Sequence, residues 1–421
     1  MVPLHPLEAT EERVILIAVE LDDNTTDACL DELEELVKTA GGVCVARAIQ
    51  KREKIHAGHY IGKGKIEEIK MMLQTYDASG IVCDDELSPA QMKNLEQMLQ
   101  TKIMDRTMVI LDIFAARAMS KEGKIQVELA QLKYRLSRLV GIGASMSRLG
   151  GGIGTRGPGE TKLETNRRYI KERISELNQE LKQIETHRQL LRNQRNKKGT
   201  PVVSLVGYTN AGKSTLINTL TNAGVLAENK LFATLDTTTR KVKLPNGTEI
   251  LLTDTVGFIQ KLPHHLIQAF RATLEELNFA DILLHVVDAS NENRQQQMEV
   301  VYQTLKGLHC EGTPIITVYN KIDKGIETPF PIDPMARDKV SISAKTQEGI
   351  PVLLEKIETL LKSFRTPMTV FLPYTEGSLL SRIHGKCEII TEEHKADGIL
   401  LQVYAEQEMV NRLQKYHVAE R

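Results

Sequence analysis

The sequence predicts an α/β fold whose central part is a parallel sheet flanked by helices. Short apolar runs alternate with helical patterns over residues 1–110, and a glycine-rich loop follows a buried-type strand at 202–206. Two long amphipathic stripes lie between these regions. We expect four parts: a small α/β domain at 1–110, a long antiparallel helical hairpin at 111–199, a P-loop domain at 200–365 and a small α+β domain at 366–421.

Composition limits the class of protein. The chain has 421 residues and a formal net charge of −1, and its five cysteines are scattered without a CxxC pair. This pattern argues against a disulfide framework or a zinc site and is typical of a reducing cytosol. The apolar runs are too short to span a bilayer, and the first residues lack the features of a signal peptide. We therefore expect a cytoplasmic protein without a membrane partner.

The first 110 residues read as strands and helices in alternation. Strands are expected at 14–21, 43–48, 80–83 and 102–105, and helices at 26–39, 65–76 and 89–100. Ser88 and Pro89 are typical of a helix start, with serine as the cap and proline in the first turn. The alternation favours a small parallel sheet.

The segment from 107 to 198 predicts two long helices. Apolar residues recur at steps of three and four from Ile125 to Leu139 and again from Ile170 to Ile184, so each helix carries one apolar stripe. Eight glycines lie between them, within 141–160. The simplest arrangement packs the stripes together, with the glycine-rich segment as an exposed tip loop. An arm of roughly 30 residues is ~45 Å long.

Charge is concentrated on this hairpin. Residues 121–200 contain 18 Lys and Arg against 8 Glu and no Asp, a local charge of +10 that leaves −11 for the remainder. A basic segment of this kind suits a polyanion, and the alternative is a solvated helix surface or a coiled-coil spacer. Arg148 and Arg156 in the tip are the expected RNA contacts. Because aromatic residues make up only 4% of the chain, structured RNA is the expected target, and no DNA partner is expected.

The strand at 202–206 leads directly into the pattern GxxxxGKS at 207–214. Its glycines allow successive backbone N–H groups to face one phosphate group, and the helix that follows adds its positive end. Lys213 is expected to reach the β- and γ-phosphates, and the Ser214 hydroxyl is expected to coordinate Mg²⁺. This loop alone does not distinguish ATP from GTP.

Three later elements favour guanine. Asp254, at the start of the DTVG sequence 254–257, is expected to hold Mg²⁺ through water, and the Gly257 N–H to contact the γ-phosphate. Asp323 of the NKID sequence 320–323 can accept hydrogen bonds from N1 and N2 of guanine, donors that adenine lacks. The SAK sequence 343–345 places a backbone N–H near guanine O6.

The hydrolytic residue is harder to find. Phe258 occupies the position at which many GTPases carry the glutamine that orients the attacking water. We therefore expect slow intrinsic turnover. Asn210 resembles the asparagine with which some GTPases hold K⁺ against the phosphates, and the alternative is that it only shapes the loop. By spacing alone, Thr234, Thr237, Thr238 and Thr239 are all candidates for the switch threonine on Mg²⁺.

These motifs together resemble the HflX family of translational GTPases. The glycine-rich block at 151–164, the loop at 207–210, the segment 232–236 and the DTVGF sequence at 254–258 carry the resemblance, which covers nearly the whole chain. It implies that Thr234 is the Mg²⁺ threonine, that the partner is the large ribosomal subunit with its rRNA, and that the activity is splitting or rescue of stalled ribosomes. One departure is Thr237, where the family often has proline after the aspartate.

The expected site can then be stated in full. The residues expected to contribute directly to catalysis are Lys213, Thr234 and Gly257. The expected GTP contacts are Gly207, Tyr208, Thr209, Asn210, Ala211, Gly212, Lys213, Ser214, Thr215, Phe232, Ala233, Thr234, Leu235, Asp236, Asp254, Thr255, Val256, Gly257, Asn320, Lys321, Asp323, Ser343, Ala344 and Lys345. Expected Mg²⁺ ligands are Ser214, Thr234 and, through water, Asp254.

Two alternatives remain open. The chain could be an RNA-remodelling or RNA-modification factor driven by GTP or ATP, or a switch that acts on a protein through a coiled coil. The glycine-containing stretch 58–65 could be a second phosphate-binding loop for ATP, but its pattern is not a Walker motif and a turn is the favoured interpretation. We expect the protein to be a monomer when it is free in solution. We also expect part of it to be bound to ribosomes. The sequence of the last 55 residues does not indicate a particular site.

Overall fold

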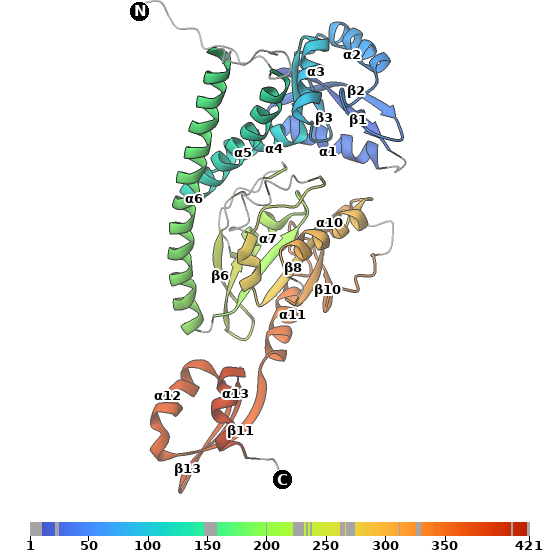
Figure 1. Ribbon diagram of the computed structural model, residues 1–421. Helices are drawn as coiled ribbons and strands as arrows, with labels where there is room; N and C mark the ends of the chain where they lie inside the picture. The colour runs from blue at the N-terminus through green and yellow to red at the C-terminus, as the bar shows by residue number, and fades with distance from the viewer. Residues whose placement is uncertain are drawn as a thin grey trace, which may run out of the picture.

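The computed structural model describes residues 11–21, 25–146, 158–198, 200–221, 231–232, 235, 238–261, 266, 274–310, 312–325, 330–405 and 407–418. These residues form three sheets, two of which belong to α/β layers and one to a small α+β unit (Figure 1). The predicted fold class is confirmed: a parallel-rich sheet flanked by helices lies at the centre of the chain. No described helix is long and apolar enough to cross a membrane.

The first sheet has the strand order β2-β1-β3-β4, and every neighbouring pair is parallel. Its elements are β1 (Glu12–Glu20), α1 (Thr26–Thr39), β2 (Gly42–Lys51), α2 (Lys63–Thr75), β3 (Gly80–Cys83), α3 (Pro89–Leu99) and β4 (Lys102–Asp105). All seven were predicted from the sequence, although β2 is longer at both ends. The Ser88 hydroxyl accepts a hydrogen bond from the Gln91 N–H, which confirms the predicted cap of α3.

One helix was not predicted. Helix α4 (Arg106–Arg117) follows β4 directly, capped by the Asp105 side chain. Its apolar residues are buried on more than one side, including the run from Val109 to Leu111. A helix buried in this way has no clear apolar stripe, so its period is hard to recognise in the sequence.

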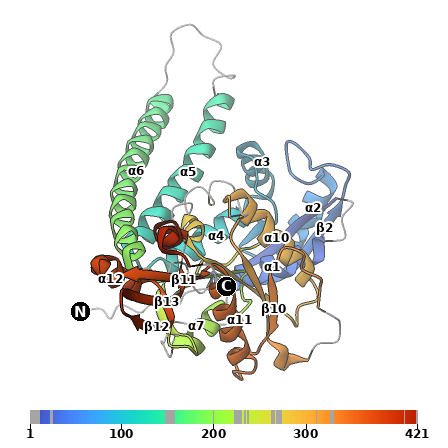
Figure 2. The same cartoon turned by 90° about the horizontal axis from the view of Figure 1, so that it is seen from below.

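Helices α5 (Lys121–Met146) and α6 (Pro158–Lys198) lie side by side as a long hairpin (Figure 2). Ile125 and Leu129 of α5 pack on Leu177 of α6, so the predicted apolar stripes do face each other. The helices extend further into the glycine-rich segment than the sequence indicated. Arg148 and Arg156 lie outside the described residues. Near the other end of the hairpin, Arg188 of α6 pairs with Glu122 and with Glu276.

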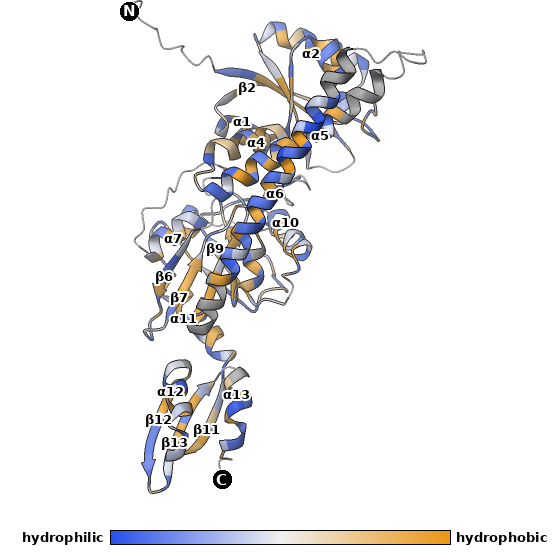
Figure 3. Cartoon of the chain, turned by 60° about the vertical axis from the view of Figure 1, so that its left-hand side comes forward, coloured by the Kyte–Doolittle hydropathy of each residue, from blue (hydrophilic) through white to orange (hydrophobic). Residues whose placement is uncertain are grey.

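The central sheet has the order β10-β9-β8-β5-β7-β6, and only the edge strand β6 is antiparallel to its neighbour. Its elements are β5 (Val202–Gly207), α7 (Lys213–Thr221), β6 (Thr239–Lys243), β7 (Glu249–Thr253), η1 (Glu275–Phe279), β8 (Ile282–Asp288), α10 (Arg294–Gly307), β9 (Ile315–Asn320), η2 (Ile322–Lys324), β10 (Asp338–Ser341) and α11 (Ile350–Ser363). Hydrophobic residues, coloured orange, are concentrated on the strands of this sheet, whereas α6 is largely hydrophilic (Figure 3).

The last described residues form a separate three-stranded antiparallel sheet of order β11-β13-β12. Its elements are β11 (Thr366–Pro373), η3 (Tyr374–Glu376), α12 (Gly377–Lys386), β12 (Glu388–Lys395), β13 (Gly398–Ala405), α13 (Gln407–Leu413) and η4 (Gln414–Tyr416). The predicted α+β character is confirmed. Alternate residues of β11, such as Val370 and Leu372, pack into the core of this unit.

Candidate nucleotide site

The loop between β5 and α7 depends on two glycines. Gly207 has φ +152°, and a Cβ there would lie 2.3 Å from the Val286 carbonyl oxygen. Gly212 has φ +96°, and a Cβ there would lie 2.2 Å from Asn320 Nδ2. Both positions combine left-handed backbone with a close neighbour, so only glycine fits. The loop therefore closes tightly on the carboxyl ends of β8 and β9.

Lys213 is buried beneath this loop. Its ammonium group donates to the carbonyl oxygens of Gly207, at 3.0 Å, and Tyr208, at 2.7 Å. Burial lowers the pKa of Lys213 to about 8, although the nearby Asp254 carboxylate acts in the opposite direction. A cation held in this way, with little water around it, is suited to bind phosphate oxygens.

Ser214 and Asp254 lie together at the start of α7. The Ser214 hydroxyl donates to Asp254 Oδ2 at 3.3 Å, and the carboxylate is fully buried. Asp254 Oδ1 accepts the Thr255 N–H at 3.0 Å. A hydroxyl beside a buried carboxylate is the oxygen donor set that Mg²⁺ prefers, so the residues present fit that ion. Thr234, Ala233, Asp236 and Thr237 lie outside the described residues.

The end of the site expected to bind the base is held together by side chains. The Ser343 hydroxyl donates to Asp323 Oδ1 at 2.7 Å, and this hydrogen bond lowers the pKa of Asp323. Asn320 Nδ2 donates to the Ala211 carbonyl at 2.9 Å, and Asn320 Oδ1 accepts the Ala344 N–H at 2.9 Å. Asn320 therefore links the P-loop to the 343–345 loop, and Asp323 is ionised and oriented to accept hydrogen bonds.

Lys321 spans the site between these two ends. Its ammonium group donates to the Asn210 carbonyl and to Asp288 Oδ2, both at 2.7 Å. Lys321 and Asn210 both have positive φ, +66° and +58°. Two non-glycine residues in this conformation, joined by a hydrogen bond, mark a tightly constrained part of the fold.

Several predicted site residues direct their side chains elsewhere. The Phe232 ring packs edge-on against Phe114 of α4, with ring centroids 4.7 Å apart. The Tyr208 hydroxyl donates to Glu32 of α1, so its ring faces the first α/β unit. Leu235 and Val256 are buried in the same apolar cluster, and the Thr255 hydroxyl donates to the Leu205 carbonyl. Any contact of these residues with nucleotide would come from their backbone.

Known families match this arrangement. Residues 27–115 match the family "GTP-binding GTPase N-terminal", residues 117–195 match "GTP-binding GTPase Middle Region", and residues 202–321 match "50S ribosome-binding GTPase". The chain is 56% identical to the GTPase HflX of Lacrimispora saccharolytica, over 97% of both chains. The chain belongs to the HflX family of GTPases.

A second curated relative and a solved structure are also similar to this chain. The GTPase HflX of Escherichia coli is 42% identical over 93% of both chains. A solved GTP-binding protein from Sulfolobus solfataricus, in complex with GDP, is 25% identical, with a TM-score of 0.43 over 83% of this chain and 98% of that one. The two HflX relatives confirm the predicted family, and the protein is a GTPase with a P-loop domain that binds GTP.

The sequence did not reveal that polar residues of the first α/β unit contact the GTPase domain beside its nucleotide site. Asp84 and Asp85 follow β3, while Asp105 and Arg106 end β4 and begin α4. Charged residues at the carboxyl ends of parallel strands commonly gather at one edge of a sheet, and this signal was available. What it could not indicate is that this edge faces residues 208 and 260–261.

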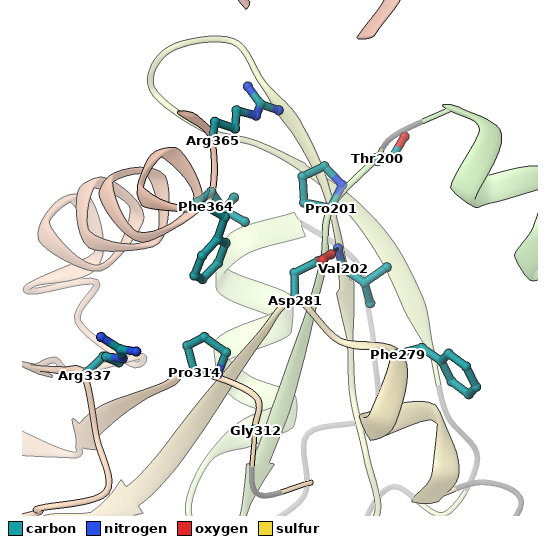
Figure 4. A pocket seen from close by; sticks show the side chains of 11 residues that line it. Thr200, Pro201, Val202, Phe279, Asp281, Gly312, Pro314, Arg337, Phe364 and Arg365 are labelled. Carbon is teal, nitrogen blue, oxygen red and sulfur yellow. Dashed lines mark hydrogen bonds between the residues drawn. The ribbon is translucent and has the colours of Figure 1, made fainter. Parts of the chain in front are cut away.

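Two other features lie apart from the site. In the 58–65 stretch, the N–H groups of Gly58 and His59 donate to His56 Nδ1, and the Gly62 N–H donates to Gln50, which supports the turn interpretation. A hollow of about 750 Å³ lies at the amino ends of β5 and β9, between Pro201 and Phe364 (Figure 4). It is at the opposite end of the sheet from the P-loop.

Proposed function

We propose that this HflX-family GTPase is Mg²⁺-dependent, associates with the large ribosomal subunit through its rRNA, and splits or rescues stalled ribosomes. The observation that carries the guanine specificity is the Asp323 carboxylate, ionised and oriented by Ser343. Guanine offers two donors to such a carboxylate. Adenine would leave it desolvated without a partner, which costs orders of magnitude in affinity.

The phosphate end supports named roles. Lys213 would bind the β- and γ-phosphates, and the Gly257 N–H would donate to the γ-phosphate. Ser214 and Thr234 would hold Mg²⁺ directly and Asp254 through water. When bound, Mg²⁺ offsets the negative charge that the phosphates carry in the transition state.

The water that attacks the γ-phosphate must be oriented by a group other than the side chain of Phe258. Phe258 is buried in an apolar cluster and has no polar atom in its side chain. Slow intrinsic hydrolysis, stimulated by the ribosome, is therefore proposed. K⁺ at Asn210 is one way to assist it. Equal GTP turnover in KCl and in NaCl would exclude that role for K⁺.

The ribosomal partner is supported by two features. The central domain matches a family described as 50S ribosome-binding, and the hairpin segment 121–200 has a net charge of +10. A basic arm ~45 Å long could carry its tip, with Arg148 and Arg156, into a deep RNA cavity. A cytoplasmic protein that is a monomer when free and partly ribosome-bound is consistent with this function.

Co-sedimentation with ribosomal subunits tests the proposal. In the presence of a non-hydrolysable GTP analogue the protein should pellet with the large subunit, less so with GDP, and salt should weaken this binding. A variant that lacks residues 141–160 should bind nucleotide normally and fail to split ribosomes. Binding to free RNA but not to subunits would instead favour the RNA-remodelling or RNA-modification alternative. Normal splitting by the deletion variant would contradict the role of the tip.

A further inference from the structure

The hydroxyl group of Thr209, in the loop between β5 and α7, has no hydrogen-bond partner among the residues that the structure describes. Thr209 is only 6% exposed, so this hydroxyl is enclosed by protein. Most buried hydroxyls have a partner, because burial without one is unfavourable. A buried hydroxyl without one, in the loop that binds the phosphates, points to a role that begins when the nucleotide binds.

Thr209 lies directly against Gly257, the residue whose N–H is proposed to donate to the γ-phosphate. A Cβ at Gly257 would lie 2.9 Å from both Cα and Cγ2 of Thr209. The same Cβ would lie 3.1 Å from Lys213 Nζ. Thr209 is therefore on the same side of Gly257 as the Lys213 ammonium group, which is where the γ-phosphate is expected.

The backbone of Thr209 is fixed by hydrogen bonds to the DTVGF sequence. Its N–H donates to the Phe258 carbonyl at 2.8 Å, and the Phe258 N–H donates to the Gly207 carbonyl at 3.1 Å. Residues 208 and 258 thus form a short parallel bridge. Because threonine is branched at Cβ, its side chain also has few conformations available. The Thr209 side chain is therefore held at the junction of the two segments expected to contact the γ-phosphate.

Three other polar side chains of these segments are engaged elsewhere. Gln260 is the first glutamine after the DTVGF sequence, and its Oε1 accepts from the Cys29 thiol, with 3.1 Å between oxygen and sulfur. The Thr255 hydroxyl donates to a backbone carbonyl of β5 at 2.6 Å. The Tyr208 hydroxyl oxygen accepts the Gln260 N–H at 2.8 Å. The side chain of Gln260 therefore faces α1 and does not take the place of a catalytic glutamine.

A hollow beside Thr209 gives water access to this end of the site. Its volume is about 270 Å³, and its lining includes Thr209, Asn210 and Gln260. Most of the residues that line it are polar, among them Asp288 and Asn291. A polar hollow of this size has room for several water molecules and offers them hydrogen-bond partners. Water can therefore approach the phosphate end of the site on the side where Thr209 lies.

A threonine hydroxyl can donate one hydrogen bond while it accepts another. At this position it can donate to a γ-phosphate oxygen and accept from a water molecule, whose lone pair then faces phosphorus. As the water oxygen bonds to phosphorus, the bond to the bridging oxygen breaks and its electron pair leaves with GDP. The proton that water loses passes to an oxygen of the released phosphate. The hydroxyl of Thr209 therefore stays neutral throughout.

We propose that the Thr209 hydroxyl orients the attacking water in this GTPase, the task that the apolar side chain of Phe258 cannot perform. This inference rests on the proposed roles of Lys213 and Gly257, and it adds to them the residue that contacts the water. It is independent of K⁺ at Asn210, because a cation acts on the charge of the phosphates. Loss of the Thr209 hydroxyl should therefore slow hydrolysis in KCl and in NaCl alike.

Thr209→Val tests the inference, with Thr107→Val as the matched control. Thr107 of α4 is fully buried, and its hydroxyl also has no partner among the described residues. Single-turnover hydrolysis of GTP with Mg²⁺ measures the chemical step without product release. Thr209→Val should slow this step roughly 10- to 100-fold, because a hydrogen bond that aligns the water is lost. Thr209→Ser, which keeps the hydroxyl, should stay within about threefold of the wild-type rate, and Thr107→Val should equal it.

Two further measurements separate this role from a structural one. By calorimetry, Thr209→Val should bind GDP as tightly as the wild-type chain. Its midpoint of denaturant unfolding should not fall, because a methyl group replaces a buried hydroxyl that has no described partner. An unchanged rate in Thr209→Val, or an equal loss in Thr209→Ser, would overturn the inference while the proposed function stands. Failure of the wild-type chain to bind a GTP analogue with Mg²⁺ would contradict both.

Discussion

The two ends of the nucleotide site differ in what holds them. At the base end, Asn320, Asp323 and Ser343 are bonded to each other and to neighbouring loops of the same domain. At the phosphate end, Tyr208 and Gln260 are bonded to side chains of the first α/β unit. The base end is therefore complete within one domain, and the phosphate end is shared between two.

This difference separates two tasks. In the proposed function, recognition of guanine needs a fixed geometry, which a short local network of hydrogen bonds would provide. Sensing the γ-phosphate needs an element that can move, and its position must be transmitted to the part that binds the partner. A residue at the base end should therefore alter which nucleotide binds. A residue at the interface should alter the preference between GTP and GDP.

The largest effect is expected at the base end. Asp323→Asn removes the carboxylate acceptor for the two guanine donors, so affinity for GDP should fall by about 100-fold or more. The amide of the new residue can donate to the carbonyl that xanthine carries in place of the guanine amino group. Titration calorimetry should therefore show binding of xanthosine diphosphate in the variant. Unchanged GDP affinity would contradict the assignment of the base end.

A change at the apolar contact between the first α/β unit and the GTPase domain should alter the preference between GTP and GDP and leave the preference for guanine unchanged. Phe114 packs on Phe232, so Phe114→Ala should reduce the free energy of unfolding by about 3 kcal/mol and loosen this contact. It should also shift the ratio of GTP-analogue to GDP affinity without altering the preference for guanine. Leu95→Ala, in a separate apolar cluster of the same unit, is the control. It should destabilise the chain by a similar amount and leave the ratio unchanged.

The smallest effect is a dependence on pH at the phosphate end. Burial lowers the pKa of Lys213 to about 8, and phosphate binding favours the charged form. Raising the pH from about 7 to about 8.5 reduces the protonated fraction roughly fourfold, so affinity for GDP should fall by about that factor. Lys213→Met should bind weakly at every pH and lose this dependence. A flat profile in the wild-type chain would show that Lys213 stays charged.

The same group has a defined effect on stability. In the unfolded chain Lys213 has an ordinary pKa near 10.5, so between about pH 8 and that value the unfolded state holds more protons than the folded state. Stability of the nucleotide-free chain therefore gains a contribution that rises with pH through this window. The gain should be absent from Lys213→Met, as measured by denaturant unfolding.

The sequence alone determined the nucleotide chemistry. The P-loop, the DTVG and NKID sequences and the SAK loop are each short, and each follows a strand, so residue spacing was enough to bring Lys213, Asp254 and Asp323 to one edge of a sheet. The apolar stripes that begin at Ile125 and Ile170 likewise predicted the two helices of the hairpin. The helical spacing of apolar residues, with a period of 3.6, can be read from neighbouring positions in the sequence.

Only the tertiary structure decided how this site is connected to the rest of the molecule. The contact between Glu32 and Tyr208 joins residues 176 positions apart, and the contact between Lys261 and Asp85 also joins 176 positions. Such pairs leave no periodic trace in a sequence, since they depend on how two separately folded units pack. Helix α4 was hidden for a related reason: burial on several sides removes the polar face that marks a helix.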